Sequence, residues 1–217
     1  MKTNNLQGLD IPELNTLSEL WPCPDNLQPL AQQMLEGILS EHPSQESPTI
    51  IHLCGIPGSG KSTYARQLKQ ENADYYTLSF DQIMSELPGY RDDCITAGLK
   101  QAFARWELPA RGLGYYFLKA LLRAKRSILF DHSGANESHI ILLRQIGKIA
   151  YRTELHYIPC DIETARLRVK ERESQTQRHT PEHYLTERAA LLENLLPKYR
   201  QVVHHYREAK PAKPEES

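Results

Sequence analysis

Short apolar runs alternate with stretches of helical periodicity along most of the chain. The apolar runs predict four strands, at residues 50–54, 75–80, 128–131 and 155–159. Helical patterns occupy residues 62–71, 92–125 with an interruption at Pro109, 137–149, 163–172 and 182 onward. Strands separated by helices indicate βαβ units, so the expected fold class is α/β with a mostly parallel sheet. The segment QVVHHY predicts either a fifth strand or the end of the last helix.

The two ends of the chain differ from this middle part. Residues 1–48 contain one predicted helix, DNLQPLAQQMLEGILSE, with Asp25 as its N-cap, and a linker, HPSQESP. Residues 207–217 are charged, contain two prolines and predict a disordered tail. The predicted organisation is an N-terminal helical extension with a linker, a core domain at residues 49–206, and the tail. Because the extension has an apolar stripe to bury, we hypothesise that it folds over the core domain and restrains its site.

Composition narrows the classes of function. The chain has 217 residues, of which 40% are hydrophobic and 24% charged, as in ordinary soluble globular proteins. A formal net charge of -1 argues against nucleic acid as the partner, since such proteins carry an excess of Lys and Arg. The four cysteines show no C-x-x-C spacing, which argues against a zinc or dithiol site built from them. No signal-peptide core or bilayer-length apolar run is present, so we predict a cytoplasmic protein without a membrane partner.

The loop after the first predicted strand indicates phosphate chemistry. Its sequence, GIPGSGKS, matches the Walker A pattern G-x-x-x-x-G-K-[ST]. Glycines let backbone N–H groups turn towards an anion, and the following helix directs its positive end there. We therefore expect ATP and Mg²⁺ as cofactors, with Lys61 on the β- and γ-phosphates and Ser62 on the metal. The residues predicted to bind the nucleotide are Gly55, Ile56, Pro57, Gly58, Ser59, Gly60, Lys61, Ser62 and Thr63.

Two carboxylates follow later predicted strands. Asp81 comes just after the second one, and parallel sheets bind ligands at the carboxyl ends of their strands. A carboxylate there can accept a proton from an attacking hydroxyl, but Asp81 equally suits the N-cap of the next helix. Asp131 ends the third predicted strand and is expected to hold Mg²⁺ as a Walker B carboxylate. The alternative for Asp131 is a turn or cap residue.

A charged helix follows the fourth predicted strand. Arg168 and Arg172 are four residues apart and share one face, so they could clamp a phosphoryl group in transfer. The alternative is a solvated charged helix. His179 and His183 also have a spacing that can suit zinc. However, Thr-Pro-Glu at residues 180–182 predicts a helix start with the threonine as cap, which puts His179 outside that helix.

The segment YYTLSFDQIMSELPGY resembles the zeta-toxin kinases and the related polynucleotide-kinase-like enzymes. Both families place a short x-x-D at the end of the second strand, and the zeta-toxin pattern continues to a proline and an aromatic at the spacing of Pro88 and Tyr90. The resemblance covers scattered motifs from residue 49 to 172. It implies a P-loop kinase-type sandwich with a sheet of four to five strands flanked by helices. It also implies that Asp81 is the catalytic base and that arginines at the position of Arg168 and Arg172 form a lid.

This resemblance further implies an ATP-dependent kinase that phosphorylates a hydroxyl of a small acceptor, with UDP-N-acetylglucosamine as the leading candidate, and an antitoxin partner. The chain departs from the zeta toxins at Ser79, where they carry a second Asp, and at Met84, where they carry a basic residue. Arg91 and Arg111 could replace the charge that Met84 removes. A polynucleotide 5′-hydroxyl kinase, a small-metabolite kinase and a non-catalytic nucleotide-binding switch remain open alternatives.

Overall fold

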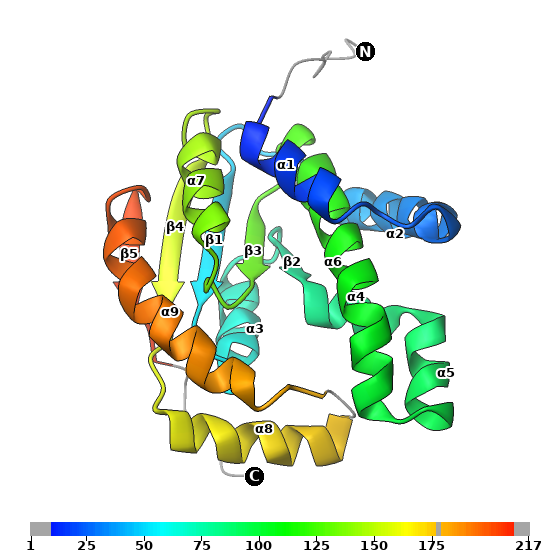
Figure 1. The fold of residues 1–217 in the computed structure, drawn as a ribbon. Helices are drawn as coiled ribbons and strands as arrows, with labels where there is room; N and C mark the ends of the chain where they lie inside the picture. The colour runs from blue at the N-terminus through cyan, green and yellow to red at the C-terminus, as the bar shows by residue number, and fades with distance from the viewer. Residues whose placement is uncertain (1–9, 177–178, 211–217) are drawn as a thin grey trace.

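A five-stranded parallel sheet forms the centre of the molecule (Figure 1). The computed structural model describes residues 10–176 and 179–210. The strand order is β2-β3-β1-β4-β5, and every neighbouring pair is parallel. The strands are β1 (Thr49–Cys54), β2 (Tyr76–Ser79), β3 (Ile128–Asp131), β4 (Arg152–Tyr157) and β5 (His205–Glu208). The α/β fold class predicted from the sequence is therefore confirmed, and the last two residues of QVVHHY, His205 and Tyr206, belong to the fifth strand.

Strand β1 lies in the middle of the sheet, between β3 and β4. All six of its residues are buried, as expected for a parallel strand covered on both faces. Ile50 pairs with Ile128 of β3 and with Thr153 of β4. Strand β2 runs parallel to β3, with Ser79 opposite Asp131. These strands therefore end at the same edge, so the loops that follow β1, β2 and β3 meet there. This edge carries the candidate functional site.

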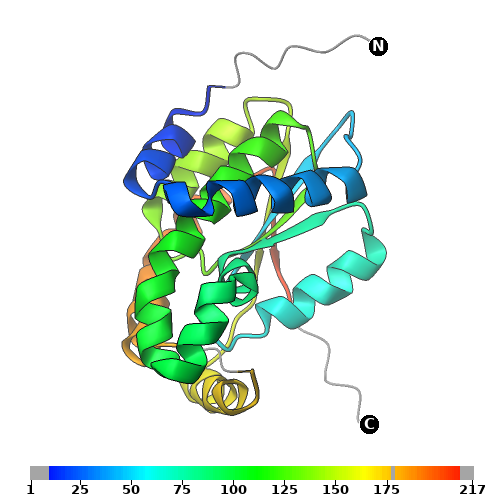
Figure 2. The ribbon, with the colours of Figure 1, turned by 90° about the vertical axis from the view of Figure 1, so that its right-hand side faces the viewer.

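Helices cover the two faces unequally (Figure 2). Alternate residues of β1 point to opposite faces: Ile51 and Leu53 join a small cluster with α3, and Ile50 joins a much larger one. The larger cluster includes residues of α4, α6, α7 and α9. The helices after β1 are α3 (Lys61–Glu71), α4 (Phe80–Glu86), α5 (Pro88–Thr96), α6 (Leu99–Arg123), α7 (Glu137–Ile146), α8 (Ile162–Thr176) and α9 (His183–Arg200).

The helix predicted at residues 92–125 with a break at Pro109 is wrong in its details. It is two helices, α5 and α6, and they separate at Gly98, whose φ of 86° is in the left-handed region that favours glycine. Pro109 lies inside α6, which continues past it. A proline removes one N–H donor, but the packing of α6 against α4, α5 and α1 holds the helix together.

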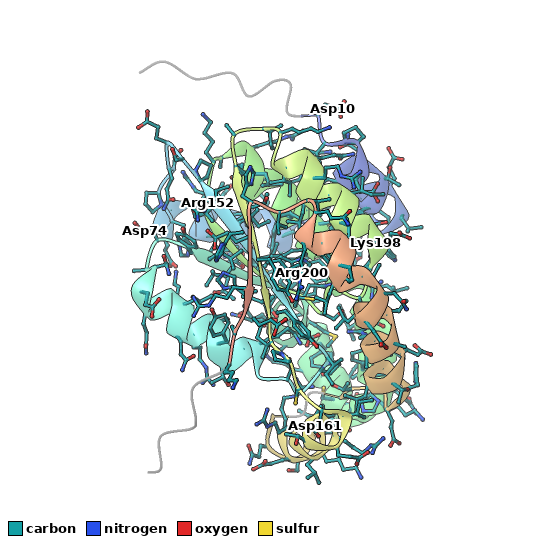
Figure 3. The ribbon with its side chains drawn as sticks, turned by 90° about the vertical axis from the view of Figure 1, so that its left-hand side faces the viewer. Asp10, Asp74, Arg152, Asp161, Lys198 and Arg200 are labelled. Carbon is teal, nitrogen blue, oxygen red and sulfur yellow. The ribbon has the colours of Figure 1, made fainter. Side chains whose placement is uncertain are left out.

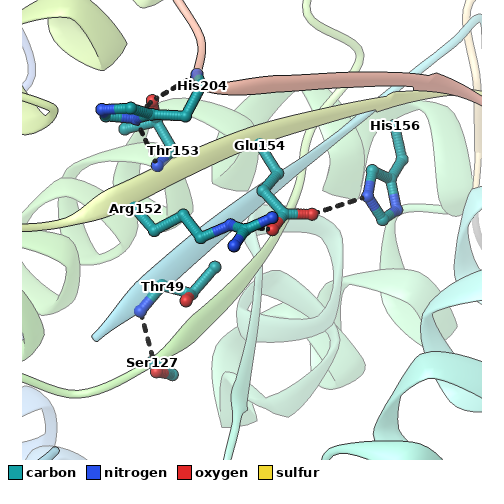
Figure 4. Close-up of polar contacts among 7 residues, drawn as sticks. All are labelled: Thr49, Ser127, Arg152, Thr153, Glu154, His156 and His204. Atoms are coloured by element: carbon teal, nitrogen blue, oxygen red, sulfur yellow. Dashed lines mark hydrogen bonds and ion pairs between the residues drawn. The ribbon is translucent and has the colours of Figure 1, made fainter. Parts of the chain in front are cut away.

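Strand β4 starts earlier than predicted, because polar side chains form its first half. Arg152 Nε contacts Glu154 Oε1 at 2.7 Å, and His156 Nε2 lies 3.2 Å from Glu154 Oε2 (Figure 4). On the other face the Thr153 N–H donates to His204 Nδ1 at 3.1 Å. These contacts satisfy the hydrogen-bonding groups of the polar residues in the strand. A strand predicted from its apolar run alone therefore starts too late.

The N-terminal part holds two helices instead of the one predicted. They are α1 (Pro12–Leu20) and α2 (Gln28–Glu41), with a short 3₁₀ turn (Asp25–Leu27) between them. The prediction of Asp25 as N-cap is wrong: its Oδ1 accepts from the Gln28 side-chain amide at 2.9 Å, and α2 has no side-chain cap. Helix α1 packs against α6 and α7, and its buried residues belong to the same hydrophobic cluster as Ile50.

The predicted tail also starts too early. Arg207 and Glu208 belong to β5, which pairs with β4. The next residue, Ala209, is buried, and its N–H donates to the Tyr157 carbonyl at 2.8 Å. Residues 211–217 of the predicted tail lie outside the described residues.

The shared cluster predicts that α1 is needed for stability. Leu14→Ala should lower the free energy of unfolding by about 2–5 kcal/mol, because Leu14 is 1% exposed and its removal leaves a cavity. Leu20→Ala is the matched control, since Leu20 lies on the same helix and is 62% exposed. Urea unfolding followed by circular dichroism measures both. Equal, small effects of the two changes would instead indicate a loosely attached helix.

Within the described residues, no helix combines the length and the apolar character that crossing a bilayer requires.

Candidate functional site

The glycine-rich loop joins β1 to α3 and curls around its own lysine. Lys61 Nζ donates to the carbonyl oxygens of Gly55 and Ile56 at 2.8 and 2.9 Å. Gly58 has a φ of 80°, and a Cβ there would lie 2.4 Å from the Ala165 carbonyl of α8, so no other residue fits. Burial lowers the pKa of Lys61, and the charges of Asp131 and Asp81 oppose that shift. The loop thus places one ammonium group between two carboxylates at the edge of the sheet.

Ser62 and Asp131 meet across this edge. Ser62, in the first turn of α3, donates its hydroxyl to Asp131 Oδ2 at 3.0 Å. Asp131 reaches this place because β3 runs parallel to β1, with Asp131 opposite Leu53. A hydroxyl and a carboxylate are the hard oxygen ligands that Mg²⁺ prefers. The pair therefore fits the metal-binding role predicted for both residues.

Asp81 is not a helix cap. Helix α4 starts at Phe80, and its N-cap is Ser79, whose hydroxyl accepts from the Gln82 N–H at 3.4 Å. The capping alternative considered for Asp81 from the sequence is therefore wrong. The Asp81 carboxylate lies instead in the first turn of α4 and lines a cavity together with Lys61.

Helix α8 carries the two predicted lid arginines and lies below α3 and α9 in Figure 1. Asp161, labelled in Figure 3, accepts from the Thr164 N–H at 2.8 Å and so stabilises the start of the helix. Arg168 Nη1 donates to the Gly58 carbonyl at 3.4 Å, and Arg172 Nη2 donates to Thr180 Oγ1 at 2.5 Å. Both arginines line the cavity.

The contact with Arg172 explains why α9 begins later than predicted. The sequence predicted Thr180 as its cap and Pro181 as its first residue, and both assignments are wrong. The Thr180 hydroxyl accepts from Arg172, and the Pro181 carbonyl accepts from the Tyr184 N–H at 3.0 Å in a tighter turn. Helix α9 therefore starts at His183.

One cavity of about 260 Å³ collects the predicted residues. Its walls come from the glycine-rich loop, α4, α6, the end of β3, α8 and the start of α9. The sequence-predicted residues among its lining are Pro57, Gly58, Gly60, Lys61, Ser62, Thr63, Asp81, Asp131, Arg168 and Arg172. Gly55, Ile56 and Ser59 form the buried base of the loop.

The cavity wall formed by α6 and α9 was predicted from the sequence only at Arg111, and its other polar residues, Glu107, Tyr184 and Arg188, were not. Arg188 of α9 stacks on the Tyr184 ring, with its guanidinium carbon 4.1 Å from the ring centre. Burial lowers the pKa of Arg188, while the charge of Asp81 opposes the shift. On α6, Arg111 Nη2 donates to Glu107 Oε1 at 2.7 Å, and the Tyr184 hydroxyl donates to the same carboxylate at 3.3 Å. Both arginines belong to i, i+4 pairs, a spacing that exposed helices show as well.

The two arginines proposed to compensate for Met84 lie in different places. Met84 is 2% exposed and lines the cavity. Arg111 lines it too, whereas Arg91 of α5 donates through Nε to the Ser85 carbonyl of α4 at 2.9 Å. Arg111 is therefore positioned to contribute charge at this wall.

The sequence of this chain matches a known protein family, and its fold is similar to several solved structures. The family model described as AAA domain matches residues 50–195. No curated protein sequence matches the chain. A solved structure from the PezAT chromosomal toxin–antitoxin system of Streptococcus pneumoniae is similar, with a TM-score of 0.64 at 15% identity over 97% of this chain and 80% of that one.

Two further solved structures share the fold. AvrRxo1-ORF1:-ORF2 with ATP has a TM-score of 0.60 at 19% identity, over 93% of this chain and 64% of that chain. A putative kinase from Chloroflexus aurantiacus has a TM-score of 0.54 at 18% identity, over 79% of this chain and 92% of that one. These likenesses establish a P-loop kinase-like fold.

Proposed function

Since this chain belongs to the AAA domain family and has a P-loop kinase-like fold, we propose that it transfers the γ-phosphoryl group of ATP to a hydroxyl of a small molecule. The observation that carries the proposal is the single cavity lined by Lys61, Asp81 and Asp131 together with two arginines of α8. A site that only binds nucleotide has no need of a second carboxylate such as Asp81, or of a pair of arginines in the same cavity. A carboxylate that can accept a proton and cations that stabilise developing charge both suit phosphoryl transfer.

Each residue has a role in this scheme. On ATP binding, Lys61 exchanges the carbonyls of Gly55 and Ile56 for phosphate oxygens. Ser62 and Asp131 would hold Mg²⁺, which would supply positive charge to the phosphates. Asp81 accepts the proton of the acceptor hydroxyl as the acceptor oxygen bonds to the γ-phosphorus, while the bond from that phosphorus to the bridging oxygen breaks and ADP leaves.

Arg168 and Arg172 stabilise the charge that spreads over the phosphoryl oxygens during transfer. Because Arg168 also contacts the Gly58 carbonyl, α8 is held against the phosphate loop.

The acceptor we favour is UDP-N-acetylglucosamine. Arg111 and Arg188 line the wall beyond Asp81, and two guanidinium groups suit an anionic acceptor. Glu107 and Tyr184 at the same wall can hydrogen-bond hydroxyl or amide groups of a sugar. Met84 supplies an apolar surface where the zeta toxins have a charge.

The test is transfer from labelled ATP to three pools: UDP-amino sugars, 5′-hydroxyl oligonucleotides and a cell metabolite extract. We expect labelled product from UDP-N-acetylglucosamine. Product from another metabolite would identify a different small acceptor, whereas labelling of oligonucleotides alone would contradict the small-acceptor proposal. ATP binding without product in any pool would favour the nucleotide-binding switch.

A protein partner of the antitoxin type is part of the same proposal. It rests on the fold shared with a chain of the PezAT toxin–antitoxin system. Purification of the untagged protein from its native source, followed by size-exclusion chromatography, tests it. A partner that co-elutes and inhibits transfer supports the proposal, and elution of an active chain alone contradicts it.

A further inference from the structure

Three histidines from distant parts of the chain meet beneath the cavity. His52 lies on β1, His132 follows Asp131 at the end of β3, and His139 lies in the first turn of α7. Each offers one ligand atom, and these atoms all lie within 4.8 Å of one another. The ring centres of His132 and His139 are 4.5 Å apart, and those of His52 and His139 are 5.4 Å apart.

Two of these imidazoles are buried, and each has at least one ring nitrogen without a hydrogen-bond partner in the described part of the chain. His52 and His139 are each 0% exposed. Among the described residues, neither nitrogen of His52 nor Nδ1 of His139 has a partner. Burying an imidazole nitrogen without a partner is costly, so such groups usually indicate a bound water or ion.

The protonation of the cluster suits a metal. Burial lowers the pKa of His52 and His139, and the neighbouring His139 lowers that of His52 further. The pKa of His139 falls to about 3. These two imidazoles are therefore neutral at pH 7, and neutral imidazole is the form that binds metal ions.

We propose that His52, His132 and His139 bind one zinc ion. Three imidazoles without a carboxylate favour zinc and similar transition metals over Mg²⁺ or Ca²⁺, which take oxygen ligands. Three protein ligands leave a fourth position for water, as in many zinc sites. Zn–N bonds of about 2.0–2.1 Å require the rings to converge slightly from their present separation.

Neighbouring groups determine which nitrogens bind. Tyr115 Oη lies 2.9 Å from His139 Nε2, which leaves Nδ1 of His139 for the metal. A hydrogen bond from Nε2–H to the Tyr115 oxygen would then orient the ring. The Gly134 N–H donates to His132 Nδ1 at 3.3 Å, a long bond that would be lost when His132 takes the tautomer that binds zinc through Nε2.

The zinc ion has a path to its site, because His132 also lines the cavity. The site is chemically distinct from the oxygen pair of Ser62 and Asp131. Bound zinc would join β1, the end of β3 and the start of α7, and would fix the segment that carries Asp131. The inference concerns the stability of this region and holds whether or not the chain transfers phosphate.

The experiment uses the full-length chain without a histidine tag, stripped with a chelator and titrated with Co²⁺ as a visible probe, then with Zn²⁺ in competition. We expect one equivalent of Co²⁺ to give the intense visible absorption of a four-coordinate site, and Zn²⁺ to displace it. Zinc should also raise the melting temperature. His52→Phe and His132→Asn should each weaken zinc binding at least about a hundredfold, and Tyr115→Phe about tenfold.

His205→Asn is the matched control, because His205 is exposed on β5. It should bind zinc as the unchanged chain does. His132→Asn remains informative if His52→Phe does not fold, since His132 is only half-buried. Absence of a one-equivalent site, or equal affinity in the His132→Asn variant and the control, would overturn the inference.

Discussion

Lys61→Ala should lower the rate of ATP-dependent phosphoryl transfer by at least about a hundred- to a thousandfold. The ammonium group of Lys61 is the cation of the phosphate loop, and Asp131 and Asp81 lie close enough to act on its pKa. Its removal leaves the negative charge that builds on the phosphates without this counter-charge. Turnover of labelled ATP with the best acceptor measures the loss.

Stability should change much less than turnover. The substitution removes two hydrogen bonds, to Gly55 and Ile56, but it also removes the cost of burying a charge, and these contributions oppose each other. Lys148→Ala is the control, because Lys148 is exposed beyond the end of α7. A Lys61→Ala variant with turnover close to that of this control would show that the loop does not serve phosphate transfer.

Asp81→Asn should keep ATP binding and lower turnover by about a hundredfold or more, the usual contribution of a positioned general base. The amide has nearly the same shape as the carboxylate but cannot accept the proton of the acceptor. Single-turnover transfer and equilibrium ATP binding, measured on the same preparation, separate the two effects.

Two control variants separate catalysis from folding at this helix. Ser79→Ala removes the N-cap of α4 and should lower stability by about 1 kcal/mol while leaving turnover nearly unchanged. Asp92→Asn changes an exposed carboxylate on the neighbouring helix α5 and should alter neither. Equal losses of ATP binding and turnover in Asp81→Asn would instead indicate that the carboxylate supports the structure of the site.

The sequence predicts those parts of the fold and site whose residues are neighbours along the chain. The apolar run of β1 and the glycine-rich loop after it stand together in one stretch, so both strand and loop could be placed. Helix α1 escaped prediction because only Leu14 and Leu17 mark its buried face within nine residues. The start of β4 was missed because its first residues are polar and are satisfied by tertiary contacts.

The wall formed by α6 and α9 could be predicted only in part, for a different reason. Arg111 was expected to supply charge, but Arg188 comes from a helix far along the chain, and only packing shows that both line one cavity. The grouping of the three histidines was even harder to predict from the sequence. Their spacing along the chain matches no metal-binding pattern, and they come together through the pairing of β1 with β3 and the docking of α7.

The position of β1 in the sheet has a consequence for how the protein is made. Ile50 leaves the ribosome well before its partners at residues 128 and 153, and β5 follows later still. During that interval an apolar strand has no neighbour to pair with, and long-range parallel pairing is slow to form. We expect the nascent chain to depend on chaperones until β3 and β4 have emerged, and slower translation within residues 55–127 to increase aggregation.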